Sequence, residues 1–143
     1  MMQAHPLVKE PVRTGQRSQI IDLTDAVRRI VRQRKVTDGM VVLYVPHTTA
    51  GVTINENYDP DVKHDLLRKL DALIPKNEPY YQHDEGNSDS HLKTALVGNS
   101  ATVLIDHGDL VLGRWQGIYF CEFDGPRERE VYVKVVDFRA RGE

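Results

Sequence analysis

The C-terminal third of the chain consists of strand-like segments joined by very short turns. Asp106-His107-Gly108-Asp109 and Asp124-Gly125-Pro126-Arg127 have the composition of turns and separate runs with strand character. Strands that follow one another across such short connections pair antiparallel, because a parallel pair needs a much longer crossover. The strands predicted in this part of the chain cover residues 101–105, 110–112, 115–123 and 130–138.

The first two thirds of the chain add further short strands and three helices. Thr24 and Asp59 are residues of the type that caps a helix, and Pro60 suits the first helical position. A third, short helix is predicted over residues 90–97, after a polar loop over 76–90 whose length is typical of functional loops. The remaining predicted strands cover 8–12, 18–21, 40–45 and 52–56. We therefore expect an α+β fold: a mainly antiparallel β-sandwich decorated with two longer helices and one short helix.

The length and composition predict one domain over residues 1–143 and restrict the possible partners. A net charge of -2 provides no basic surface for nucleic acid. With one cysteine, Cys121, the chain cannot form an intrachain disulfide, which fits a reducing compartment. We expect Cys121 to be buried as a small apolar residue. No apolar run approaches the ~18 residues of a membrane span, and the N-terminus lacks a signal-peptide core. We expect a cytoplasmic protein with no nucleic-acid or membrane partner.

Polar side chains of varied chemistry gather in residues 47–56, directly after the strand predicted over 40–45. A histidine, hydroxyls, an amide and a carboxylate occur there within a few residues, and similar clusters follow at 81–91 and 113–117. Segments that only need to fold seldom collect so many hydrogen-bonding groups. If the clusters converge in space, they form a polar pocket that could hold a metal or a phosphate.

Three histidines, His47, His83 and His91, each lie in a polar turn or at the end of a predicted element. Three neutral imidazoles that meet would form an open site for a divalent metal. The alternative is that each one only hydrogen-bonds to nearby backbone groups, and no compact ligand motif decides between the two hypotheses.

Strand periodicity limits which groups can share this pocket. In a regular strand that starts at His47, Asn55 would lie on the same face and Glu56 on the opposite one. Either the chain bends over residues 46–51, or Glu56 serves a different surface, such as a contact between subunits. Arg127 and Arg129 could bind a phosphate bidentately or form surface ion pairs.

Taken together, these motifs resemble the YjbQ-like family, which is associated with secondary thiamine-phosphate synthase activity. They occur in the family's order over residues 47–129. The matching segments are His47-Thr48-Thr49-Ala50, Ile54-Asn55-Glu56-Asn57-Tyr58-Asp59-Pro60, His83-Asp84-Glu85-Gly86-Asn87, Ser90-His91-Leu92-Lys93, Gly113-Arg114-Trp115-Gln116-Gly117-Ile118 and Glu122-Phe123-Asp124-Gly125-Pro126-Arg127.

The resemblance implies a homotrimer with a pocket near a subunit boundary, and a divalent metal, zinc, on His47, His83 and His91. The implied reaction joins hydroxymethylpyrimidine pyrophosphate to a thiazole phosphate and releases pyrophosphate. We assign catalytic roles to Glu56 and Glu122. The predicted substrate-binding residues are Thr48, Thr49, Asn55, Asn87, Trp115, Gln116 and Arg127.

Two other functions remain open. A histidine-bound zinc could serve a hydrolase of a small phosphorylated or carbonyl substrate, since bound zinc generates hydroxide near neutral pH. The same residues could instead form a non-catalytic ligand- or metal-binding trimer. Zinc suits a set of histidines better than magnesium, the usual partner of pyrophosphate, which prefers oxygen ligands.

Overall fold

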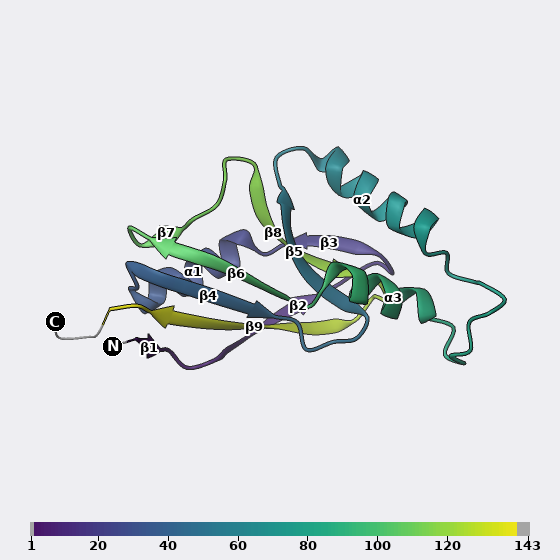
Figure 1. The fold of residues 1–143 in the computed structure, drawn as a ribbon, viewed down its shortest axis with the longest axis horizontal. Helices are drawn as coiled ribbons and strands as arrows, with labels where there is room; N and C mark the ends of the chain where they lie inside the picture. The colour runs from purple at the N-terminus through teal and green to yellow at the C-terminus, as the bar shows by residue number, and fades with distance from the viewer. Residues whose placement is uncertain (1, 140–143) are drawn as a thin grey trace.

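A computed structural model describes residues 2–139, which form two antiparallel sheets and three helices (Figure 1). The larger sheet has the order β1-β9-β4-β6-β7, and β2 also pairs with β9. Its strands are β1 (Gln3–Ala4), β2 (Val8–Arg13), β4 (Asp38–Tyr44), β6 (Ser100–Asp106), β7 (Asp109–Leu110) and β9 (Glu128–Asp137). The smaller sheet has the order β3-β8-β5, with β3 (Gln19–Asp22), β8 (Gln116–Glu122) and β5 (Ala50–Glu56). The predicted α+β, mainly antiparallel fold is confirmed.

Strand β8 is buried along nearly its whole length because both of its faces are covered. On one face, Ile118 and Phe120 belong to the main core, which includes Val41 and Leu43 of the larger sheet. On the other face, Tyr119, Cys121 and Phe123 pack with Leu70 of helix α2. Burial raises the pKa of the Cys121 thiol to about 12, which agrees with the prediction that this cysteine is an inert apolar residue.

The helices are α1 (Thr24–Arg34), α2 (Pro60–Leu73) and α3 (Ser88–Val97). Asp59 caps α2 as predicted, since its side chain accepts a hydrogen bond from the Asp61 N–H. Thr24 was expected to cap α1, but it is the first helical residue, and the cap position is Leu23. The Thr24 hydroxyl instead accepts a hydrogen bond from the Ile118 N–H of β8, at 2.9 Å. It therefore ties the helix to the smaller sheet.

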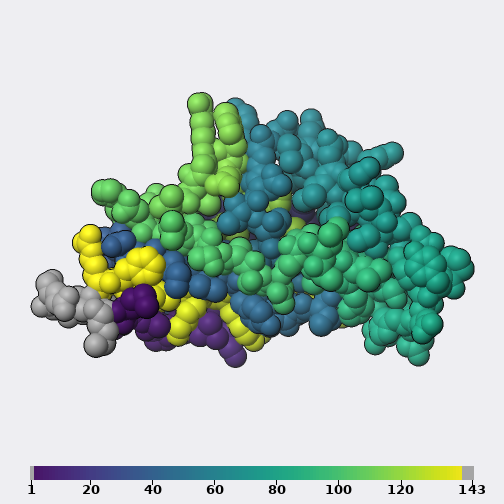
Figure 2. All heavy atoms as spheres, viewed as in Figure 1, coloured from purple at the N-terminus to yellow at the C-terminus, as the bar shows by residue number. Residues whose placement is uncertain are grey.

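The arrangement of these elements places the polar segments at 47–49 and 81–91 near one end of the molecule. In Figure 1, α2, α3 and the loop between them lie at the end opposite to β1, and the space-filling view shows the same arrangement (Figure 2). That loop covers residues 74–87, because α3 begins two residues earlier than the sequence predicts. Gly51 lets the C-terminal end of α3 lie against β5: a Cβ there would stand 2.4 Å from the Gly98 carbonyl oxygen. None of the helices in residues 2–139 is long and apolar enough to cross a membrane.

Candidate functional site

A polar cleft of about 330 Å³ lies where the segment before β5, the N-terminal part of α3 and the β8–β9 turn meet. Six of the predicted site residues line it: His47, Thr48, Thr49, Asn87, His91 and Arg127. The cleft also contains Arg129, a candidate phosphate ligand in the sequence, and three residues to which the sequence assigned no site role: Pro46, Glu85 and Asp124. Segments that are far apart in the chain therefore supply one concave, hydrogen-bonding surface.

His47 forms one wall of the cleft and is held by the neighbouring strand. Its Nε2 atom accepts a hydrogen bond from the Glu130 N–H at 3.0 Å. With Nε2 as the acceptor, the proton of the neutral ring is on Nδ1, so the ring can donate a hydrogen bond there. Burial and the nearby charge of Arg129 lower the pKa of His47, and these effects favour the neutral ring. In this arrangement neither nitrogen offers a free lone pair to a metal.

A buried ion pair lies beneath the cleft. Arg129 donates to both carboxylate oxygens of Glu122, through Nε at 2.8 Å and a terminal nitrogen at 2.5 Å, and also to the Thr49 hydroxyl. Burial opposes ionisation of Glu122. The hydrogen bonds from Arg129, the Asp124 N–H and Thr14 outweigh it, so the pKa of Glu122 lies below its usual value.

Because all of these donors converge on its carboxylate, Glu122 is suited to hold the residues around the cleft in place rather than to exchange protons. Arg129, which could have been free to bind a phosphate, is buried and committed to this pair.

Helix α3 is anchored by buried charges, and this anchorage places His91 at the cleft. Arg17 pairs bidentately with Asp89, and Lys93 contacts both Asp89 and Asp71. Asp89 is fully buried and Lys93 nearly so, at 0% and 1% exposure. This network was not predicted from the sequence, although the i,i+4 spacing of Asp89 and Lys93 is a visible signal.

The opposite rim of the cleft carries Arg127, whose side chain is half exposed. Its guanidinium is oriented by Asp124, which accepts from Nε through its carbonyl and from a terminal nitrogen through its carboxylate. The same carboxylate accepts a hydrogen bond from the Asn87 side-chain amide at 2.8 Å. Arg127 is therefore the arginine of this cleft that remains accessible to a ligand.

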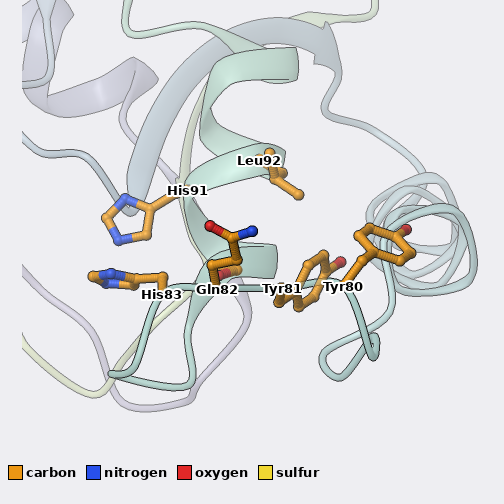
Figure 3. Close-up of a pocket in the computed structure, with 7 residues that line it drawn as sticks. Tyr80, Tyr81, Gln82, His83, His91 and Leu92 are labelled. Atoms are coloured by element: carbon orange, nitrogen blue, oxygen red, sulfur yellow. The ribbon is translucent and has the colours of Figure 1, made fainter.

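A second cavity, of about 540 Å³, adjoins the polar cleft and shares His91 with it (Figure 3). His83 lines this second cavity and not the polar cleft. The rings of His83 and His91 meet edge to face, with centroids 5.2 Å apart. The His83 Nε2 atom lies 3.8 Å from a carboxylate oxygen of Glu85.

The three predicted metal ligands thus do not line one cavity together: His47 lines the polar cleft, His83 lines the second cavity, and His91 lines both. Within residues 2–139, no three His, Cys, Asp or Glu side chains are placed so that they could hold a metal ion as they stand. His83 nevertheless lies next to both His91 and Glu85, whose side chains are of the donor types that bind zinc.

The other predicted site residues lie at the far end of the smaller sheet. Ala50 pairs with Glu122 at the cleft end, whereas Glu56 pairs with Gln116 six residues away, which corresponds to roughly 20 Å along the strand. Trp115 packs edge to face with Tyr58 at 5.1 Å. Four predicted residues therefore lie away from the cleft within one chain: Asn55, Glu56, Trp115 and Gln116.

Comparison with known proteins identifies close relatives. The family model described as UPF0047 protein YjbQ-like matches residues 9–137. A UPF0047 protein from Methanocaldococcus jannaschii is 53% identical over 130 residues, which cover 91% of this chain and 94% of that protein. The UPF0047 protein YugU from Bacillus subtilis is 48% identical and covers 87% of this chain and 95% of its own.

Solved structures agree with these sequence matches. A YjbQ/UPF0047 family protein from Clostridium acetobutylicum has 51% identity and a TM-score of 0.87, covering 90% of this chain and 98% of that one. A YbjQ-like protein of unknown function from Sulfolobus solfataricus has 28% identity and a TM-score of 0.90, covering 96% and 99%.

Proposed function

This chain belongs to the YjbQ-like UPF0047 family, and from that membership and the geometry of the polar cleft we propose that it is a small-molecule transferase. In this proposal the cleft binds a phosphorylated substrate, and the reaction resembles that of a thiamine-phosphate synthase. The observation that supports it is the convergence of Arg127, His47 and Asn87 on one concave surface.

The cleft offers hydrogen-bond donors suited to a phosphate group. The half-exposed guanidinium of Arg127 matches phosphate oxygens with a planar fork of donors, and Asp124 holds its orientation. The neutral ring of His47 donates from Nδ1, because the Glu130 N–H occupies Nε2. Donors fixed in this way before the substrate arrives stabilise negative charge that develops during a reaction.

The proposed reaction needs charge stabilisation more than a base. The thiazole nitrogen forms a bond to the methylene carbon of the pyrimidine substrate, and the carbon–oxygen bond to pyrophosphate breaks. The negative charge leaves with pyrophosphate, and no proton has to be removed as the new bond forms. This requirement agrees with a Glu122 carboxylate that is buried and saturated with hydrogen bonds.

We include zinc in this proposal as the metal that would assist the site. His83, His91 and Glu85 would hold it, and the loop that carries His83 and Glu85 would have to move, since the three are not placed to bind a metal as they stand. When bound, zinc would neutralise phosphate charge or lower the pKa of a bound water. His47 is not in this set, because its Nε2 lone pair is engaged by the Glu130 N–H.

The test is to incubate the purified protein with the two thiamine precursors and to quantify thiamine phosphate. We expect product from the wild type, and a large loss in Arg127→Gln and His91→Ala. Arg114→Gln is the matched control, because Arg114 is an exposed arginine that stacks on Trp115 outside the cleft. Absence of product from the wild type, or equal activity in all variants, would contradict the proposal.

A zinc-dependent hydrolase is the second candidate, favoured by the position of His83 next to both Glu85 and His91. Phosphoester hydrolysis that appears only with added zinc and is lost in His91→Ala would favour it over the transferase. The homotrimer implied by the resemblance and the cytoplasmic location expected from the composition stay predictions. Light scattering on the purified protein tests the trimer.

A further inference from the structure

The cavity next to the polar cleft differs from it in chemistry. Its walls are mainly aromatic and aliphatic, with Tyr80, Tyr81, Leu92 and the ring of His83 around about 540 Å³. That volume lies within the range of about 300–1,000 Å³ that is typical of small-molecule sites. In Figure 3 the two tyrosines lie at one side, the two histidines at the other, and Leu92 between them.

Two edge-to-face ring pairs shape this cavity. Tyr80 and Tyr81 have centroids 5.3 Å apart with an interplanar angle of 82°, and His83 and His91 have centroids 5.2 Å apart at 85°. The Tyr81 hydroxyl donates to the Pro75 carbonyl at 2.9 Å, which fixes that ring within the loop. Aromatic rings placed edge to face leave other faces and edges available to a further planar ring.

His91 lines both cavities, so the two adjoin at that side chain. We propose that the aromatic cavity is the ring subsite of the same site, and that the substrate is a phosphorylated compound with a planar aromatic ring on a short link. The phosphate occupies the polar cleft and the ring lies among Tyr80, Tyr81 and Leu92. This inference rests on the proposed phosphate site and adds the place in the structure where the ring of the substrate lies.

The test uses three simple probes with the full chain and measures their affinities by calorimetry. Benzyl phosphate carries both groups, methyl phosphate carries the phosphate alone, and benzyl alcohol carries the ring alone. We expect benzyl phosphate to bind about tenfold more tightly than methyl phosphate, since burial and ring contacts of this size contribute about that factor.

Two substitutions on α3 distinguish an effect on the ring subsite from the general effect of a new surface charge. Leu92→Glu places a charge in the aromatic cavity at a position that is 46% exposed, so the fold can tolerate it. We expect it to remove the advantage of benzyl phosphate over methyl phosphate, a ratio that repulsion of the phosphate group alone would leave unchanged. Leu96→Glu is the matched control, because Leu96 lies one turn further along α3, is 63% exposed and does not line the cavity. It should leave both affinities unchanged.

The outcomes distinguish this inference from the proposed function. Equal affinities for benzyl and methyl phosphate in the wild type, with binding of both lost in Arg127→Gln, would overturn the ring subsite and leave the phosphate site standing. Binding of benzyl alcohol that Leu92→Glu abolishes, with no binding of methyl phosphate, would overturn the phosphate site instead. If the ring adds nothing and Leu92→Glu changes the oligomeric mass, the cavity is a contact with a second copy of the chain, and the inference is wrong.

Discussion

Arg129 and Glu122 form an ion pair that is buried beneath the polar cleft and joins β9 to β8. The side chains are 6% and 0% exposed, and two of the hydrogen bonds between them measure 2.8 and 2.5 Å. The same guanidinium donates to Thr49 at the edge of the cleft. The pair therefore links the smaller sheet, the larger sheet and the segment that carries His47.

Glu122→Gln should destabilise the protein strongly, because it leaves the Arg129 charge buried without a counter-ion. Loss of one partner of a buried pair typically costs about 3–5 kcal/mol in the free energy of unfolding. Urea denaturation at neutral pH measures the change. Glu128→Gln is the control, since its pair with Arg13 is largely exposed and should contribute little. Similar losses in the two variants would contradict this assignment.

The stability of the protein should also depend on His47 as the pH falls. Burial and Arg129 place the folded-state pKa of His47 below its unfolded value of 6.5. The unfolded chain therefore binds the proton more readily, and stability decreases as the pH falls through 6.5 towards the folded-state pKa. His47→Gln should flatten this part of the profile, measured by denaturant midpoints from about pH 7.5 to about pH 5. Parallel profiles for wild type and variant would rule out the contribution.

Local patterns predict much of this fold because turn-forming and helix-capping residues mark the ends of several of its strands and helices. The turn at 106–109 joins β6 to β7 and the turn at 124–127 joins β8 to β9, as expected, and Asp59-Pro60 opens α2. Local patterns do not reveal partners that are distant in the chain. Thr24 has the composition of a cap, yet its hydroxyl binds the N–H of Ile118, 94 positions away. The strand β1 is only two residues long, too short to show a periodicity.

The candidate site also depends on partners that are distant in the chain, which local patterns do not reveal. The motifs indicated that His47, Asn87, His91 and Arg127 were functional candidates, and these residues do line one cleft. Which carboxylate would be saturated by hydrogen bonds depends on the register of β8 against its neighbours, and sequence periodicity cannot supply that register. Residues of one motif can also lie far apart because an extended strand runs between them. Glu56 and His47 belong to one polar segment, yet Glu56 lies at the end of β5 that is remote from the cleft.

Tyr119→Phe should stabilise the protein. Tyr119 is fully buried, and its hydroxyl has no hydrogen-bond partner among residues 2–139. A buried hydroxyl without a partner costs about 1 kcal/mol or more, so removing it should raise the free energy of unfolding by about that amount. The contrasting variant is Tyr81→Phe, which removes the hydrogen bond to Pro75 and should lower stability. Destabilisation by both variants in urea denaturation would show that the Tyr119 hydroxyl is satisfied.

Zinc binding should depend on His83 and His91 but not on His47. His83 and His91 meet edge to face, and His83 also lies next to Glu85. The Nε2 lone pair of His47, by contrast, accepts a hydrogen bond from the Glu130 N–H. Calorimetric titration of zinc into the metal-free protein should therefore give weaker binding in His83→Ala and His91→Ala, by at least about tenfold, as is typical when a metal site is disturbed.

The controls for this titration separate a built site from general histidine binding. His47→Ala should retain the wild-type affinity, and so should His64→Ala, because His64 is an exposed histidine on α2 that contacts the adjacent Asp65. If zinc binding disappears in His47→Ala, the hydrogen bond from Glu130 must open to release a ligand, and the assignment of His47 as a donor is wrong. If the wild type binds no zinc, the metal has no part in the reaction, and Arg127 and the ring of His47 must stabilise the leaving phosphate unaided.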